Sequence, residues 1–116
     1  MRTQRWVAFV VVVGGMFGVA GSLVAQEKGL VFAHRGGAHE FEENTLAAFR
    51  GSYEKGLRGF ETDIRMTQDG ELVILHDDTL DRTHNATGAV EQKTAAELGK
   101  VVTKKSGQPM LFLKDL

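Results

Sequence analysis

The chain has 116 residues, of which 25% are charged and 42% hydrophobic, and its formal net charge at pH 7 is −1. This near-neutral balance excludes the basic surface stripe that nucleic-acid binding requires and the polybasic patch of a protein that binds anionic membranes. Cysteine is absent, which excludes a disulfide framework, a thiolate nucleophile and a lipid-modified cysteine.

Residues 1–25 have the composition of an export signal. Arg2 and Arg5 give the segment a positive start, residues 7–13 are almost entirely aliphatic, and small residues end it. We favour a cleaved signal peptide, because glycines weaken a stable helix and small residues follow. The apolar run also approaches the ~20 residues that span a bilayer, so an uncleaved membrane anchor is the alternative. The sequence therefore predicts a secreted or periplasmic protein, or a membrane-anchored one, with residues 26–116 as the folded part.

The first predicted elements follow the order strand, helix, strand. Residues 30–33 are an apolar run of strand length that ends at a glycine-containing turn. Asn44 or Thr45 can cap a helix, apolar residues then recur at helical spacing, and Gly56 ends it. Residues 59–66 form the next strand. This order predicts a βαβ unit with parallel strand pairing.

A hairpin and a short helix are predicted next. Residues 67–70 contain an Asp-Gly pair, which supplies the positive φ of a hairpin turn. Residues 71–75 return as a strand with apolar side chains on both faces, so we expect it to be buried on both sides. Residues 94–98 form a short helix with a capping box between Thr94 and Glu97.

Two carboxylates, Glu61 and Asp63, stand two residues apart inside one predicted strand, so their side chains point to the same face. Two like charges side by side are costly unless a cation lies between them. Carboxylate oxygens suit Mg²⁺ or Ca²⁺. The alternative is an ion-pair network with Arg58 and Arg65. Two carboxylates are too few to hold a metal tightly, so a third ligand has to come from His76 or a later residue.

Two histidines and an arginine stand at the ends of predicted strands. His34 follows the first strand, where βα folds bind ligands, and imidazole exchanges a proton near neutral pH. A plain exposed loop histidine is the alternative. Arg35 can clamp a phosphate, or it can pair with Glu42 or Glu43 at the surface. His76 can be a proton donor, a metal ligand, or a strand-end residue bonded to the next aspartate. The other two histidines lie in polar loops and receive no role.

Six short motifs follow one another across residues 30–116. They are His34-Arg-Gly36, Glu43-Asn-Thr-Leu-Ala-Ala-Phe49, Gly59-Phe-Glu-Thr-Asp63, Thr67-Gln-Asp-Gly70, Val73-Ile-Leu-His-Asp77 and Leu80-Asp-Arg-Thr83. Each motif alone is weak, but six in this order and spacing are specific. In these motifs the chain resembles the glycerophosphodiester phosphodiesterase family.

The resemblance implies an α/β fold, the N-terminal part of a (β/α)8 TIM barrel of the phospholipase C-like phosphodiesterase type. A closed barrel typically takes about 250 residues, so the barrel is incomplete in this chain. The implied activity is metal-dependent hydrolysis of glycerophosphodiesters, small-molecule substrates, to an alcohol and sn-glycerol 3-phosphate, with Mg²⁺ or Ca²⁺. A further acidic ligand would lie beyond residue 116, so we expect this chain to be a truncated and inactive part.

The family's functional residues carry over by position. By this resemblance, His34 and His76 match the family's two acid–base histidines, and Arg35 matches its phosphate-binding arginine. Glu61 and Asp63 match two of its metal ligands, and in some members the histidine equivalent to His76 is a ligand too. One position departs from the family: Glu42 stands where proline is usual, and we expect this to loosen the loop without removing any chemistry.

Two other functions remain open. A sphingomyelinase D-like phospholipase shares the histidine pair and the metal, but it needs a lipid-facing apolar loop that is not evident here. A non-catalytic metal-binding or anion-binding module is the other alternative. Contact with a membrane is expected only if the N-terminal segment is not cleaved.

Overall fold

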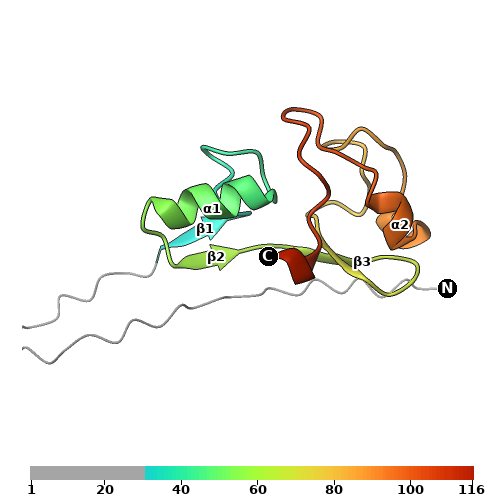
Figure 1. The fold of residues 1–116 in the computed structure, drawn as a ribbon, viewed down its shortest axis with the longest axis horizontal. Coiled ribbons are helices and arrows are strands. Elements are labelled where there is room, and N and C mark those ends of the chain that lie inside the picture. The colour runs from blue at the N-terminus through green and yellow to red at the C-terminus, as the bar shows by residue number, and fades with distance from the viewer. Residues whose placement is uncertain (1–30) are drawn as a thin grey trace, which may run out of the picture.

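The computed structural model describes residues 31–116 (Figure 1). The predicted signal peptide or anchor lies outside these residues, and none of the helices within them is long and apolar enough to cross a membrane. Figure 1 shows α1 beside the β1–β2 pair, and α2 on the right of the view, above β3. The elements are β1 (Phe32–His34), α1 (Leu46–Glu54), β2 (Gly59–Glu61), β3 (Ile64–Met66), β4 (Leu72–Ile74), α2 (Ala95–Leu98), and the 3-10 turns η1 (Val90–Gln92) and η2 (Leu113–Asp115).

The predicted βαβ unit is confirmed by β1, α1 and β2. The two strands pair in parallel, and His34 lies opposite Glu61 in their register. Thr45 caps α1, because its hydroxyl oxygen accepts the backbone N–H of Ala48 at 3.1 Å. The helix ends at residue 54, and Gly56 follows with a φ of 95°. This unit brings the carboxyl ends of β1 and β2 to one edge of the sheet.

The prediction of one continuous strand over residues 59–66 is wrong. β2 pairs with β1, whereas β3 pairs in antiparallel fashion with β4 in a second two-stranded sheet. Between them, the buried hydroxyl of Thr62 donates to Asn44 Oδ1 at 3.1 Å, and Leu75 N–H donates to the Asp63 carbonyl at 3.0 Å. The run is divided because its two halves have different strand partners, which no local pattern encodes.

The predicted hairpin is confirmed, and Gly70 takes a φ of 90° in its turn. The expectation of burial on both faces of its second strand is confirmed for Val73 and Ile74, which are 0% and 1% exposed. It is wrong for Leu72, which is 39% exposed. Leu72 pairs with the exposed Met66 next to the turn.

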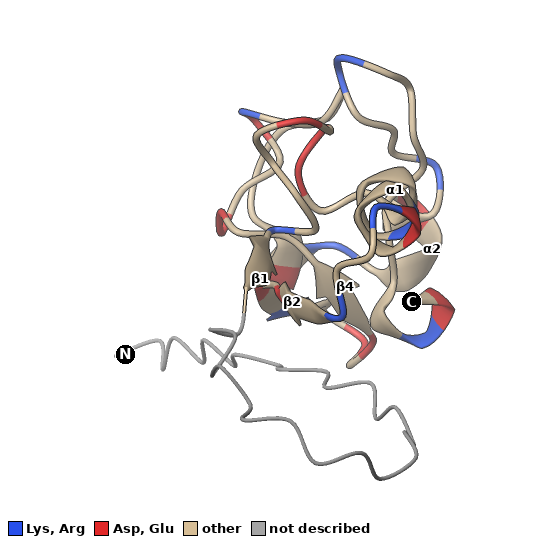
Figure 2. Ribbon diagram, turned by 90° about the vertical axis from the view of Figure 1, so that its left-hand side faces the viewer, with Lys and Arg blue, Asp and Glu red and all other residues tan. Residues whose placement is uncertain are grey.

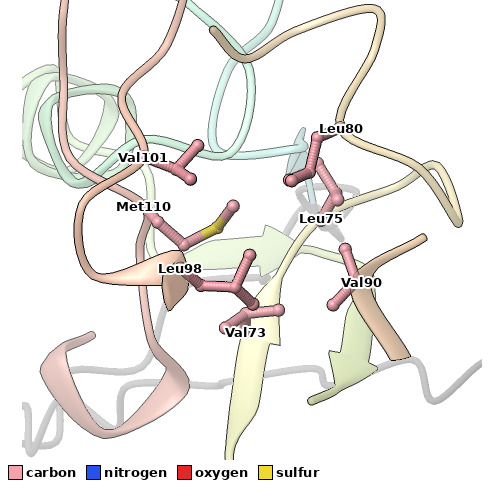
Figure 3. Packing of buried hydrophobic residues seen from close by; sticks show 7 residues of the cluster. All are labelled: Val73, Leu75, Leu80, Val90, Leu98, Val101 and Met110. Carbon is pink, nitrogen blue, oxygen red and sulfur yellow. The ribbon is translucent and has the colours of Figure 1, made fainter. Parts of the chain in front are cut away.

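The core lies on the two faces of β4. In Figure 3 the apolar side chains of the larger cluster point toward one another. On the other face, Ile74 packs with Phe49 of α1 and with Leu111, and the ring of Phe60 on β2 lies 5.8 Å from that of Phe49. β4 therefore ties the βαβ unit to the C-terminal segments. The larger cluster consists of Val73, Leu75, Leu80, Val90, Leu98, Val101 and Met110.

The capping box predicted for the short helix is confirmed. The Thr94 hydroxyl accepts the Glu97 N–H at 3.3 Å, and the Glu97 carboxylate accepts the Thr94 N–H at 2.7 Å. The cap holds α2 so that Leu98 is fully buried in the larger cluster.

The expectation that Glu42 loosens the loop before α1 is wrong. Its carboxylate accepts hydrogen bonds from the Thr103 hydroxyl at 2.7 Å, from the backbone N–H of Lys105 at 3.2 Å and of Ser106 at 3.1 Å, and from the Ser106 hydroxyl. These bonds attach the loop to a segment more than 60 residues away in the sequence.

Candidate active site

The carboxyl ends of β1 and β2 bring three of the predicted residues together. His34 ends β1 and Glu61 ends β2, and His34 Nε2 lies 3.8 Å from Glu61 Oε2. Arg35 follows His34 in the left-handed region, with a φ of 50°, and its backbone N–H donates to the same Glu61 oxygen at 3.1 Å. Parallel pairing therefore places an imidazole, a carboxylate and a guanidinium at one edge of the sheet.

Asp63 joins this group in spite of the break between β2 and β3. Its Oδ2 atom lies 3.8 Å from Arg35 Nε, and both atoms are buried without a hydrogen-bond partner among the described residues. Glu61 thus contacts the backbone of Arg35 and Asp63 lies beside its guanidinium group, although the strand that was predicted to carry both carboxylates is not continuous.

Arg58 and Arg65, which the sequence offered as alternative partners of these carboxylates, bond to other groups. Arg58 donates to the backbone carbonyls of Tyr53 and Leu57. Arg65 donates to the backbone carbonyl of His76. The alternative ion-pair network through these two arginines is therefore not formed among residues 31–116. The guanidinium of Arg35 lies beside Asp63, and its backbone N–H donates to Glu61.

The donor set matches a hard divalent cation in kind. Glu61 and Asp63 offer carboxylate oxygens, and Asp63 Oδ2 is buried without a hydrogen-bond partner among the described residues. Within residues 31–116, however, no group of three or more His, Asp or Glu side chains comes together as a metal would require. Two of the predicted ligands thus fit a metal, and the assignment of His76 as a third stays a prediction.

His76 is bonded to its neighbour, as one of its sequence interpretations allowed. Its Nδ1 atom lies 2.8 Å from Asp77 Oδ1. Asp77 also accepts Arg82 Nε–H at 2.7 Å, and the bonds from Arg82, with a smaller contribution from His76, outweigh burial and lower the pKa of Asp77 far below its usual range. An ionised Asp77 holds the proton of the imidazole on Nδ1 and leaves Nε2 free for a substrate.

Glu43 connects the two ends of the site. Its carboxylate accepts hydrogen bonds from Arg82 Nη2 at 2.6 Å and Nη1 at 2.9 Å, and Arg35 Nη1 lies 3.4 Å from it. The hydrogen bonds from Arg82 outweigh burial and lower the pKa of Glu43. The chain of contacts runs from Arg35 through Glu43, Arg82 and Asp77 to His76. It joins the loop after β1 to the loop after β4.

Sequence reasoning missed the role of Arg82. It stood in the motif Leu80-Asp-Arg-Thr83, which marked the position without indicating its partners. The partner Glu43 lies 39 residues away, so local spacing could not identify the pair. The pairing of Arg35 with Glu43, by contrast, was one of the alternatives that the sequence offered.

One of the two histidines without a predicted role is buried. His84 is 6% exposed, and Thr83 Oγ1 lies 2.8 Å from its Nδ1. Burial lowers the pKa of His84, and the nearby Glu42 and Glu43 carboxylates oppose this only in part. His84 is therefore a structural residue behind the loop that carries Glu43.

The charges around the site are mixed in sign. In Figure 2, segments with basic and acidic residues are interspersed in the loops beyond β1 and β2.

Comparison with known proteins decides the family. Residues 34–116, which include every predicted site residue, match the Glycerophosphoryl diester phosphodiesterase family. The chain belongs to this family. It is 47% identical over 74 residues to a glycerophosphodiester phosphodiesterase of Caldanaerobacter subterraneus subsp. tengcongensis, a match that covers 64% of this chain and 30% of that protein. It is 46% identical over 69 residues to human glycerophosphodiester phosphodiesterase 1, covering 60% of this chain and 21% of the human protein.

Solved structures of family members agree with this fold. A putative glycerophosphoryl diester phosphodiesterase from Agrobacterium tumefaciens matches with a TM-score of 0.68 and 33% identity, over 72% of this chain and 34% of that one. A phosphodiesterase from Oleispira antarctica, solved with the product sn-glycerol-3-phosphate, matches with a TM-score of 0.68 and 31% identity, over 72% of this chain and 36% of that one. The chain thus spans about a third of the length of these structures.

Proposed function

We propose that this chain is part of a metal-dependent hydrolase that converts glycerophosphodiesters to an alcohol and sn-glycerol 3-phosphate. The observation that carries the proposal is the convergence of His34, Arg35, Glu61 and Asp63 at the edge where β1 and β2 end. Membership of the family supports it, as does the product bound to the Oleispira relative. Because the match covers only about a third of the length of these relatives, the activity is proposed for the whole protein.

Arg35 is the proposed phosphate-binding residue. Its backbone is fixed by the hydrogen bond to Glu61, and one end of its guanidinium group is held beside Glu43. A guanidinium group has five N–H donors, so these contacts leave donors for phosphate oxygens. The group would offset the negative charge that builds up on the phosphate as the reaction proceeds.

His34 and His76 are the proposed acid–base pair. Their side chains are 60% and 44% exposed, so both are accessible to a substrate. One imidazole takes a proton from the attacking water as the water oxygen bonds to phosphorus. The other gives a proton to the departing alkoxide as the bond between phosphorus and the alcohol oxygen breaks. Asp77, on Nδ1 of His76, directs the opposite ring nitrogen to this task.

Glu61 and Asp63 are the proposed ligands of Mg²⁺ or Ca²⁺, with His76 as a third candidate. When bound, the cation would polarise the phosphate and help to neutralise it. The remaining ligand would come from the part of the family fold that residues 31–116 do not contain.

The fold proposed for the whole protein is a (β/α)8 barrel, of which the unit β1–α1–β2 is the start. Two observations support it: these strands pair in parallel, and the chain matches about a third of the length of the solved relatives. We also propose export, to the periplasm or the medium, from the composition of residues 1–25. Neither the sphingomyelinase D-like alternative nor the binding module is favoured by an observation.

The decisive experiment assays the product of the complete reading frame with glycerophosphocholine, with and without a chelator. We expect release of sn-glycerol 3-phosphate that stops on chelation and falls by at least 100-fold in His34→Ala and in His76→Ala. His39→Ala, in the same loop as His34, is the matched control and keeps its activity. Unchanged turnover in both site variants would exclude the proposed roles. Binding of sn-glycerol 3-phosphate without any hydrolysis would favour the non-catalytic module.

A further inference from the structure

The carboxylate of Glu42 lies in a cradle of four donors. Two are the backbone N–H groups of Lys105 and Ser106, and two are the hydroxyls of Thr103 and Ser106. Partial burial raises the pKa of Glu42, but the hydrogen bonds from Ser106, Thr103 and the Lys105 amide outweigh it and keep the pKa below the usual value. The carboxylate is therefore ionised at neutral pH, and its bonds are charge-assisted.

The cradle is rigid for reasons that do not involve Glu42. Thr103 N–H donates to the Gln108 carbonyl at 2.8 Å, and Gly107 N–H donates to the Thr103 carbonyl at 3.1 Å. The backbone N–H of Gln108 also donates to Thr103 Oγ1 at 3.0 Å. Gly107 has a φ of 66°, which lets the turn close. Residues 103–108 thus form a closed turn that can serve as a fixed support.

The same turn is attached to the segment that carries Arg82. Lys104 N–H donates to the Thr83 carbonyl at 2.9 Å, and Thr103 pairs with His84 as an isolated β-bridge. On one side, then, the turn holds Glu42, whose neighbour is Glu43. On the other side it holds Thr83, whose neighbour is Arg82. Both ends of the Glu43–Arg82 contact are therefore fixed against one support.

The loop also holds Glu43 from its other side. Thr45 Oγ1 donates to the Glu42 carbonyl at 2.9 Å, and Asn44 N–H donates to the Arg35 carbonyl at 2.9 Å. Asn44 has a φ of 57°, so the chain turns sharply after Glu43. With Glu42 anchored by its carboxylate, Glu43 has little freedom to move away from Arg35 and Arg82.

We infer that Glu42 is a positioning residue of the active site. Its carboxylate fixes the loop against the 103–106 turn, and this fixes Glu43 between Arg35 and Arg82, and through Arg82 the Asp77–His76 pair. The effect on turnover rests on the proposed function. The effect on Glu43 and Arg82 does not, and it can be measured without any substrate.

The test is nuclear magnetic resonance of the full chain with Glu42→Ala and Glu42→Gln. We expect faster amide exchange at Lys105 and Ser106, by about tenfold or more, in Glu42→Ala, because two donors lose their acceptor. We also expect a shifted, faster-exchanging Arg82 Nε–H signal, since this group would no longer be held against its partners. Glu42→Gln keeps an acceptor oxygen, so both effects should be smaller than in Glu42→Ala.

Glu40→Ala is the matched control. Glu40 lies in the same loop but pairs with Lys55, the residue that follows α1, so its loss removes the same charge and leaves the cradle intact. The Arg82 Nε–H signal of Glu40→Ala should equal that of the parent chain. If Glu42→Ala does not fold, Ser106→Ala, which removes one hydroxyl donor from the cradle, should show the smaller shift of the Arg82 signal.

Kinetics of the complete protein give the second measure. Misplacement of the site groups should lower kcat by about tenfold in Glu42→Ala, with a smaller change in KM, and leave Glu40→Ala unaffected. An Arg82 signal that stays unchanged while the Lys105 and Ser106 amides become exposed would overturn the inference, because Glu42 would then cap the turn only. Absence of hydrolysis in every form, with a shifted Arg82 signal, would count against the proposed function and leave the positioning role standing.

Discussion

His34 and Glu61 are the last residues of two parallel strands and lie opposite each other in register, with Nε2 and Oε2 3.8 Å apart. The contact is a consequence of parallel pairing, since the carboxyl ends of both strands fall at the same edge. It explains why an imidazole and a carboxylate 27 positions apart in the sequence meet. The site depends on this edge, and the contacts behind it can be tested one at a time.

Loss of Arg82 should weaken the fold and loosen the site. Arg82→Met removes hydrogen bonds to Glu43 and Asp77, and we expect the free energy of unfolding to fall by about 1 kcal/mol, because solvent screens a half-exposed guanidinium. Arg82→Lys keeps the charge but cannot bind both carboxylates with a planar fork, so it should restore less than half of the loss. Urea denaturation at pH 7 measures both.

Arg50→Met, on the exposed side of α1, is the control for the lost charge and should change stability by less than half as much. Equal stability of Arg82→Lys and the parent chain would mean that net charge alone matters at this position.

Gly37 should tolerate a side chain less well than Gly70 does. Both have a positive φ, 112° and 90°, which costs alanine about 1 kcal/mol. A Cβ atom at Gly37 would also come within 2.3 Å of Ser52 Oγ, whereas one at Gly70 meets nothing within 4 Å. We therefore expect Gly37→Ala to lower the free energy of unfolding by about 2–3 kcal/mol and Gly70→Ala by about 1 kcal/mol. Thermal and urea unfolding of the two variants make the comparison. Equal losses would show that the loop after β1 moves freely enough to absorb the clash.

His84 should make the protein less stable in mild acid. Burial lowers its pKa in the folded chain below the ordinary value of 6.5. The unfolded chain therefore binds the proton more readily, and stability is lost as the pH falls below about 6.5. His84→Gln should flatten this part of the curve of unfolding free energy against pH. His39→Gln, at an exposed loop histidine, should leave the curve as it is. A slope that survives His84→Gln would assign the acid sensitivity to other groups.

Divalent cations should stabilise the chain through Asp63. A ligand that binds only the folded state raises the melting temperature, and two carboxylates bind weakly, so millimolar Mg²⁺ or Ca²⁺ is needed. We expect the rise to disappear in Asp63→Asn, in which an amide replaces the buried, unpartnered oxygen. Glu71→Gln, whose carboxylate is exposed and paired with Lys114, should keep the full response. The same shift in both variants would mean that the cation binds elsewhere.

Local features were predictable because neighbours in the sequence create them. The caps at Thr45 and Thr94 join groups three residues apart, and the Asp-Gly turn needs only the conformational freedom of Gly70. The order of strand, helix and strand indicated parallel pairing, and the motifs around His34 and Glu61 indicated the family before the comparisons placed the chain in it.

The sequence by itself thus determined the elements, the family and the residue types of the site. Only the tertiary structure decided the break at Thr62, the exposure of Leu72, and the contacts of Glu43 with Arg82 and of Glu42 with Ser106, which span 39 and 64 residues. Such contacts depend on which distant segments fold against each other. Spacing along the chain does not encode that choice, because hydrogen bonds across long loops form only after the packing of the core has brought their ends together.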